Sequence, residues 1–593
     1  MRLRLIRLRF RRRLRKGQQQ VEDFGQQAEQ QIEQHLFKRF SRLVHVRRFV
    51  LAWLTLMTLI IVVLMAQNIL LSDYFQTLQP VAGGIYTEGV VGTFSTANPL
   101  YATNDVDTTV SRLMFAGLFK YNDQNQLIGD LASSYTTDDK GLTYTVHLKP
   151  NLQWQDGQPL TSADVVFTYQ MIQNPDAQSP LQSNWRGISV TAPDPHTVVF
   201  SLPDPLAAFP YNLTNGIVPQ HLLANVTPSE LRSVDFNTVH PVGAGPFAWQ
   251  AIEVKGNDPV EAQEQIALTP FNNYQAGKPK LQQFVVHAYA DPKQLAADFK
   301  AKKLNGAEGA DNAIQPLLKK SGVQAHDLLL SAENMVFFKN SNPLFADIKL
   351  RQALVQSSNV PEIASQLGYA TTLVREPLLK GQLAYDPKYQ QSSFDLSAAK
   401  TTLANAGWTS GKDGTLTKNG QKLSFTLTVA DKPEDRRVAQ SLQQQWARAG
   451  VKVELQYLGN EDFQTALSEH NYDAILHSIA IGVDPDVFVY WDSSQADVRS
   501  ANRLNLSEYK NSTADASLEA GRTRINPAIR TIKYKPFLQV WQQDAPALGL
   551  YQPRFLYVTN GNLAGLNDHV INSATDRFNN VENWEIREAK VTD

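Results

Sequence analysis

Val438-Ala-Gln-Ser-Leu-Gln-Gln-Gln-Trp-Ala-Arg-Ala-Gly450-Val-Lys-Val-Glu-Leu-Gln-Tyr457 is the stretch from which the fold class can be read. Val438, Leu442 and Trp446 place an apolar side chain at every fourth position, which predicts a helix that ends at Gly450. Apolar and polar side chains then alternate up to Tyr457, which predicts a strand. A helix, a glycine and a strand in this order form the αβ unit of a mostly parallel sheet with helices on its faces, so we expect an α/β protein.

Similar elements lie on the N-terminal side of this stretch. Ser397 to Ala406 are predicted to form a helix closed by Gly407. The alternation of side chains from Tyr144 to Leu148 predicts a half-buried strand. The chain has 593 residues, and more than one hydrophobic core is usual at this length, so we expect two or three lobes.

Phe49 to Leu71 form an apolar run that carries no charge. About 20 apolar residues at 1.5 Å each cross a ~30 Å hydrocarbon layer, so this run is long enough to span a membrane. A buried core helix is one alternative, but core helices rarely lack a polar face over this length. A secretory signal cleaved beyond Ala66 is another, although no Ala-x-Ala site follows the run. We predict an uncleaved, single-pass signal anchor at residues 49–71.

The charges on either side of this run give its direction. Residues 1–48 carry 14 Lys and Arg against 4 Asp and Glu, a net charge of +10, and the remainder of the chain carries −11. The positive-inside rule places the basic segment in the cytoplasm and the large acidic part outside, in an extracellular or periplasmic location. An acidic outer part has no basic face for nucleic acid.

The basic segment also contains an apolar stripe. Between Val21 and Val44, apolar side chains recur at steps of three and four, which predicts an amphipathic helix. Such a helix either lies along the inner membrane surface or pairs with a partner, and the sequence leaves both open.

The chain contains no cysteine, which excludes disulfides, thiolate metal sites, Cys nucleophiles and lipid attachment through an N-terminal Cys. The histidines have no metal-binding spacing, and there is no Gly-x-Ser-x-Gly or phosphate-binding Gly-rich loop. We therefore expect no enzyme, no metal and no cofactor.

Several ordered motifs resemble one family. They are Gly83-Gly84-Ile-Tyr, Asn98-Pro99-Leu100, Leu131-Ala-Ser-Ser-Tyr135, Gly141-Leu-Thr-Tyr-Thr-Val-His-Leu148, Trp154-Gln-Asp-Gly157, Leu160-Thr-Ser-Ala-Asp-Val-Val166, Ile217-Val-Pro-Gln-His221, Pro241-Val-Gly-Ala-Gly-Pro-Phe247, Arg351-Gln-Ala-Leu354, Tyr472-Asp-Ala-Ile475 and Asp484-Pro485. Together they resemble the extracellular solute-binding proteins of ABC importers, in the peptide/nickel family 5 that binds oligopeptides and dipeptides.

This resemblance implies a two-lobed, periplasmic-binding-protein-like clamshell of class II, here preceded by one transmembrane helix. The solute-binding domain would cover 83–590. Its expected parts are lobe I (about 83–125, 241–330 and 546–590), an inserted subdomain (about 126–239) and lobe II (about 333–545). Such proteins close over their ligand by hinge motion.

The resemblance also indicates where a ligand would bind. Peptide-binding relatives place an aspartate, which pairs with the peptide ammonium group, four residues before the Pro of the Asp-Pro pair. That position is Ile481 here, so the usual anchor is missing, and Asp484 is the nearest carboxylate before the proline. The other ligand-binding candidates are Thr93, Ser95, Asn98, Arg375, Tyr490 and Trp491.

The predicted function is that of a membrane-tethered extracellular receptor that delivers peptides or peptide-like solutes to an ABC permease and its ATPase subunits. The missing aspartate favours longer, N-terminally blocked or non-peptide ligands. One alternative is a sensor that signals through the basic cytoplasmic tail. Others are a binder of oligosaccharides or metal complexes, and a structural or adhesion role on a degenerate clamshell.

Overall fold

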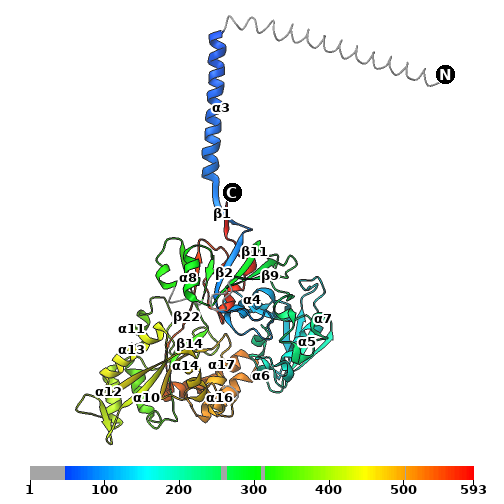
Figure 1. Cartoon of the computed structure of the whole chain (residues 1–593). Coiled ribbons are helices and arrows are strands. Elements are labelled where there is room, and N and C mark those ends of the chain that lie inside the picture. The colour runs from blue at the N-terminus through cyan, green and yellow to red at the C-terminus, as the bar shows by residue number, and fades with distance from the viewer. Residues whose placement is uncertain (1–46, 256–262, 309–313, 501–502, 593) are drawn as a thin grey trace, which may run out of the picture. The chain divides into compact units, whose positions relative to one another are not determined.

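The computed structural model describes residues 47–255, 263–308, 314–500 and 503–592. The chain divides into two compact units (Figure 1): residues 1–79 with 588–593, and residues 80–587. The helix predicted between Val21 and Val44 lies outside the described residues.

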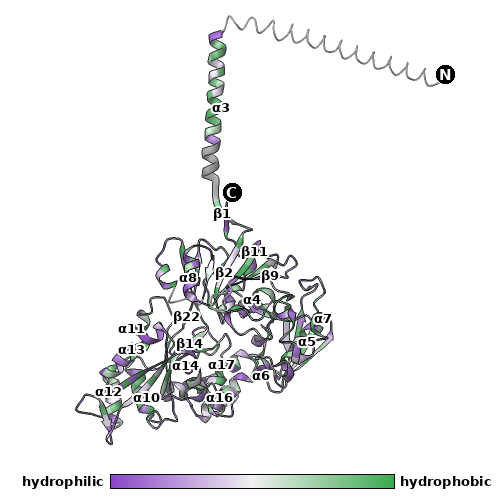
Figure 2. Ribbon diagram, in the orientation of Figure 1, coloured by the Kyte–Doolittle hydropathy of each residue, from purple (hydrophilic) through white to green (hydrophobic). Residues whose placement is uncertain are grey.

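Helix α3 (Arg47–Phe75) dominates the first unit. Its segment Arg47–Asn68 is long and apolar enough to cross a membrane, as the green ribbon in Figure 2 shows. The hydroxyl of Thr55 donates to the carbonyl of Leu51 at 2.6 Å, so this polar side chain is satisfied within the helix. By length and composition α3 fits the predicted span. The unit also contains a two-stranded sheet of β1 (Gln76–Val81) and β23 (Arg587–Thr592).

Lobe I of the second unit is built on a seven-stranded mixed sheet. In spatial order its strands are β13 (Val323–Leu329), β22 (Arg554–Asn560), β12 (Gly306–Ala307), β2 (Ile85–Val91), β11 (Gln283–Tyr289), β10 (Gln263–Pro270) and β9 (Phe247–Lys255). Strand β2 is parallel to β11 and β12, whereas the other neighbours are antiparallel. Helices α4 (Asp105–Met114) and α8 (Pro292–Lys300) pack on it. The sheet therefore joins segments that lie far apart in the sequence.

A smaller four-stranded antiparallel sheet lies within the predicted inserted subdomain. Its order is β5 (Ala132–Thr137), β6 (Thr143–Leu148), β8 (Thr197–Ser201) and β7 (Ser189–Asp194), and helix α5 (Ser162–Gln173) packs against it. The backbone N–H of Thr161 donates to Asp164 at 2.8 Å, which caps the N-terminus of this helix. Trp154 is fully buried, so this part of the family motif is structural.

Lobe II is built on a five-stranded sheet. Its order is β19 (Lys452–Leu458), β18 (Ser424–Ala430), β20 (Ala474–Ala480), β14 (Ala332–Phe338) and β21 (Ala547–Tyr551). Its longer helices are α10 (Ile348–Gln356), α12 (Leu396–Asn405), α13 (Pro433–Arg448), α14 (Asn460–Glu469), α16 (Ser512–Arg522) and α17 (Pro527–Asp544), of which the last two are orange in Figure 1.

The predicted αβ unit of lobe II is confirmed. Helix α13 ends just before Gly450, whose φ of +86° suits glycine, and β19 follows in parallel with β18. Trp446 is fully buried, and its Nε1 donates to Ser358 Oγ at 2.8 Å. The apolar stripe therefore fixes this helix on the sheet.

The described residues also form shorter elements. They are α6 (Gln182–Trp185), α7 (Gln220–Leu223), α11 (Val360–Ser365), α15 (Phe488–Trp491), β3 (Phe119–Tyr121), β4 (Leu127–Gly129), β15 (Thr409–Ser410), β16 (Leu416–Lys418) and β17 (Gln421–Lys422).

The chain crosses between the lobes at two neighbouring points. The first lies between β13 and β14, and the second between β21 and β22. The side chain of Gln552, in the second crossing, donates to the carbonyl of Leu330 in the first at 3.2 Å. Strand β21 pairs with β14, so the return to lobe I falls beyond the predicted boundary at about 546. Two short crossings side by side are typical of a hinge.

Candidate functional site

The lobe II side of the site contains a buried ion pair between Asp484 and Arg530. Both side chains are more than nine-tenths buried. The guanidinium of Arg530, on α17, donates to the two carboxylate oxygens at 2.7 and 2.6 Å, and its Nε donates to the carbonyl of Gly521 at 3.0 Å. Two parallel bonds of this kind fix the orientation of both groups. Asp484, predicted to bind ligand, is therefore held by an arginine of its own lobe.

Two tyrosines of the inserted subdomain lie within electrostatic range of Asp484. Burial, and then the negative charge of Asp484, raise the pKa of Tyr135. The same two causes, in the same order, raise the pKa of Tyr211. Because Tyr135 and Tyr211 belong to the subdomain and Asp484 to lobe II, the three groups mark the surfaces that meet between the lobes.

A second ion pair lies beside the first. Arg522 lies 3.3 Å from Asp486, and its guanidinium lies over the ring of Phe488. Burial raises the pKa of Asp486, and the charge of Arg522 opposes that shift. The carbonyl of Arg522 accepts the backbone N–H of Ala207 at 2.9 Å, which is a direct hydrogen bond between the subdomain and lobe II.

The loop containing Thr93, Ser95 and Asn98 is held by bonds to helix α4 and to the inserted subdomain. Ser95 Oγ donates to Asp107 at 2.5 Å. Asn98 is fully buried, and its amide donates to Asn237 at 2.9 Å. Thr93 is exposed, and its side chain forms no hydrogen bond with any residue that the structure describes. Ligand binding by these three residues stays a prediction, and the structure gives two of them a structural role.

The predicted aromatic residues have different surroundings. Trp491 is fully buried in the lobe II core, next to Phe337 and Trp541. Tyr490 is half-buried, and its hydroxyl donates to the carbonyl of Ala480 at 2.6 Å. Of the two, Tyr490 is the one with surface to offer a ligand.

Two further candidates, Ile481 and Arg375, lie in lobe II. Ile481 packs in an apolar cluster and is 8% exposed, so this position has no charge to offer. Arg375 is half-buried, and its guanidinium forms no hydrogen bond or ion pair with any residue that the structure describes. A free guanidinium suits a carboxylate ligand.

Sequence reasoning missed two buried acids, Glu333 and Glu376. Both are fully buried. Both oxygens of Glu333 and Oε1 of Glu376 lack a hydrogen-bond partner among the described residues. A signal existed, because Glu333 is the only charged residue of the strand Ala332-Glu-Asn-Met-Val-Phe-Phe338. A charge inside a buried strand usually has a specific reason.

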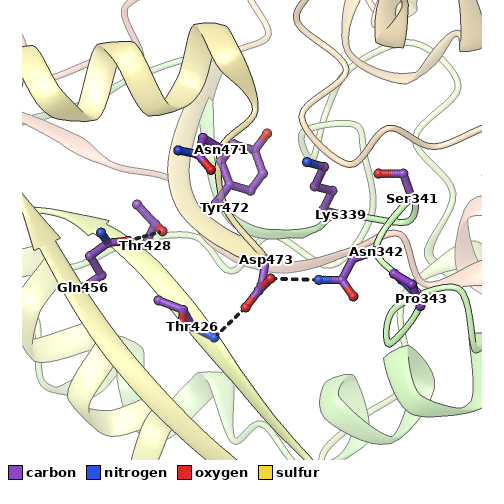
Figure 3. Close-up of a pocket in the computed structure, with 10 residues that line it drawn as sticks. All are labelled: Lys339, Ser341, Asn342, Pro343, Thr426, Thr428, Gln456, Asn471, Tyr472 and Asp473. Carbon is purple, nitrogen blue, oxygen red and sulfur yellow. Dashed lines mark hydrogen bonds between the residues drawn. The ribbon is translucent and has the colours of Figure 1, made fainter.

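A cavity of about 410 Å³ lies elsewhere in lobe II, near the end of β14. Figure 3 shows Asp473 between two donors, the amide of Asn342 at 2.8 Å and the backbone N–H of Thr426 at 3.0 Å. Lys339 also lines it and donates to the carbonyl of His470 at 2.8 Å. Its charged groups are therefore already engaged. The cavity lies at the far end of β14 from the lobe crossing. The seven residues of this strand, at about 3.3 Å each, separate the two, so we do not assign the solute to this cavity.

The chain crosses twice between two lobes, and the ion pairs of lobe II lie near tyrosines of the inserted subdomain. This arrangement is that of a two-lobed solute-binding protein. The family model of bacterial extracellular solute-binding proteins, family 5 Middle, matches residues 126–500. The chain belongs to this family, whose members serve ABC importers.

Similar proteins agree with this assignment. The oligopeptide-binding protein AppA of Bacillus subtilis is 27% identical over 524 residues, which cover 85% of this chain and 92% of AppA. The structure of AppA with a nonapeptide has a TM-score of 0.66 at 26% identity, and the match covers 86% of this chain and 100% of AppA. The structure of NikZ from Campylobacter jejuni with Ni(L-His) has a TM-score of 0.69 at 24% identity over 84% and 99% of the two chains, a likeness of fold.

Proposed function

We propose that this protein captures peptides or peptide-like solutes between its lobes and delivers them to the permease of an ABC importer, without catalysing a reaction. The likeness to AppA, which was solved with a nonapeptide, carries the proposal because it spans both lobes. The tyrosines and ion pairs described above would line the surfaces that close on the solute, and the two adjacent crossings would act as the hinge.

A peptide that binds only the folded chain is expected to stabilise it. With the full-length chain in detergent micelles, a nonapeptide pool at about 100 times its Kd should raise the free energy of unfolding by about 2.7 kcal/mol. Oligosaccharide and metal-complex pools serve as controls for the alternative ligands. Stabilisation by one of those pools alone would replace the peptide assignment, and no stabilisation by any pool would argue against solute binding.

We also propose that residues 49–71 remain attached and tether the outer domain to the membrane. The length and apolar surface of α3 support this proposal, as does the basic segment before it. Tethering keeps the receptor at high effective concentration near its transporter.

The tether predicts that the protein purified from membranes has the intact mass of the whole chain and resists alkaline washing. A substitution of Leu59 by arginine, in the centre of the apolar run, should weaken membrane retention, because an arginine there costs about 2.5–3.5 kcal/mol. A mature chain that begins beyond Ala66 and washes off the membrane would show that the run is a cleaved signal.

A further inference from the structure

Strand β14 contains a glutamate whose carboxyl group is buried in lobe II without a hydrogen-bond partner among the described residues. Glu333 is fully buried, and neither of its oxygens has a hydrogen-bond partner among the described residues. Glu376 is also fully buried. Its Oε1 has no partner, and its Oε2 accepts only a long bond of 3.4 Å from the backbone N–H of Asp386. Polar groups buried without partners are costly, so three such oxygens on two acids of the same lobe require an explanation.

The register of the sheet places this acid next to the lobe crossing. Glu333 pairs with Ile479 on β20, and two residues earlier the carbonyl of Ser331 accepts the backbone N–H groups of Ile481 and Gly482 at 2.9 and 3.0 Å. Ser331 Oγ accepts the side-chain amide of Asn125, from the other lobe, at 3.0 Å. Glu333 therefore lies in lobe II, close to the place where the two lobes meet.

Tyr490 lies near Glu333 but is only half-buried. Burial, and then the charge of Glu333, raise the pKa of Tyr490 to about 12, so the two side chains are within electrostatic range of each other. Tyr490 is half-buried and its hydroxyl is engaged with Ala480, so it does not satisfy Glu333.

The charged group that acts on Glu333 is another acid, Glu376. Burial raises the pKa of Glu333 well above its ordinary value, and the charge of Glu376 raises it further. Burial, opposed by the Asp386 backbone bond, raises the pKa of Glu376 to about 8. Both shifts favour the protonated, neutral form of the two acids in the empty protein. A cation that enters between them would replace a proton and form charge-assisted hydrogen bonds.

We propose that Glu333 and Glu376 form a buried receptor for a primary ammonium group of the bound solute, an inference that rests on the proposed solute-binding function. The three oxygens without partners equal in number the three N–H donors of an ammonium group. When the solute binds, one carboxyl group releases its proton to water, and the resulting carboxylate balances the charge of the ammonium group.

Calorimetry on the full-length chain in detergent micelles at pH 7 tests this receptor. The probes are pentaalanine with a free N-terminus, N-acetyl-pentaalanine, and an N-acetyl pentapeptide with one central lysine. We expect a peptide with an ammonium group to bind roughly ten- to a hundredfold more tightly than the acetylated pentaalanine. Tighter binding of the first probe identifies the N-terminal ammonium as the ligand, and tighter binding of the third identifies the lysine side chain.

The variant Glu333→Gln is expected to lose this preference. It replaces a neutral acid by a neutral amide of the same shape, so its thermal stability should not fall. Binding to the wild type should release about one proton, seen as a difference in heat between phosphate and Tris buffers, and the double variant Glu333→Gln/Glu376→Gln should release none. Glu454→Gln, an exposed position on β19, is the matched control and should behave like the wild type.

The outcomes separate this receptor from the proposed function. If the wild type binds all three peptides equally and Glu333→Gln changes nothing, the ammonium receptor is refuted while peptide binding stands. If the wild type binds none of the three peptides but is stabilised by the nonapeptide pool, the receptor is again refuted. If no peptide binds at all, the proposed function fails, and the receptor fails with it.

Discussion

Replacement of Arg577 by methionine is expected to destabilise lobe I by about 3–5 kcal/mol, because it leaves buried acids without their counter-charge. Arg577 is fully buried, and its guanidinium lies 3.0 Å from Glu88 and 2.7 Å from Glu308. It also donates to the carbonyl of Ala574 at 2.6 Å. Burial already raises the pKa of Glu308 to about 7 against the opposing charge of Arg577, so loss of the arginine should shift it further upward.

Denaturant unfolding of the full-length variant in detergent measures this loss. The matched control is Arg499→Met, since Arg499 also pairs with one carboxylate, that of Asp497 at 2.6 Å, but its side chain is 87% exposed. We expect no measurable change for the control. Adding Glu88→Gln to the Arg577 variant should recover part of the stability. Equal effects of the two arginine variants would contradict a buried charge cluster that holds lobe I together.

Replacement of Arg530 by methionine is expected to cost lobe II a similar 3–5 kcal/mol. The variant removes both bonds to Asp484 and the bond to the carbonyl of Gly521. It leaves a carboxylate that is 9% exposed with only the backbone N–H of Asp486, at 3.0 Å, and no counter-charge from Arg530. Because Asp484 faces the tyrosines of the inserted subdomain, solute affinity should change together with stability.

A double-mutant cycle checks the second prediction. Asp484→Asn removes the carboxylate, so the combination with Arg530→Met should be more stable than Arg530→Met alone, which gives a coupling energy of at least about 1 kcal/mol. Strictly additive losses would mean that the pair is not coupled. In that case the bidentate geometry would not explain why both groups are buried.

The fold class could be predicted because its signals are local. The stripe from Val438 to Trp446 and the capping residues Thr161 and Asp164 each report on their own element. The sheet to which β21 belongs could not be read in this way. Its sequence, Ala-Leu-Gly-Leu-Tyr551, is buried throughout and is compatible with either lobe. Pairing with β14 decides the matter, and that partner lies about two hundred residues earlier in the chain.

The site was harder to predict because its partners are distant in sequence. Asp484 was a good candidate as a carboxylate near the cleft, but Arg530, which pairs with it, lies on another helix. Trp491 was a ligand-binding candidate, whereas in the fold it is enclosed by Phe337 and Trp541. Glu333 was missed because the sequence does not show which residues surround it. Only the structure reveals that no described residue forms a hydrogen bond with its carboxyl group.

The pairing of β1 with β23 has a consequence for biosynthesis. Strand β1 leaves the ribosome early, whereas β23 ends at Thr592, at the far end of the chain. At synthesis rates of about 5–20 residues per second, the roughly 500 residues between them take about 25–100 s, during which β1 has no partner. A free strand edge next to an apolar helix invites aggregation, and the polar Gln76-Thr-Leu-Gln-Pro80 sequence, with a proline that cannot extend a ladder, limits that hazard. These features suit a strand that remains unpaired until β23 has been synthesised.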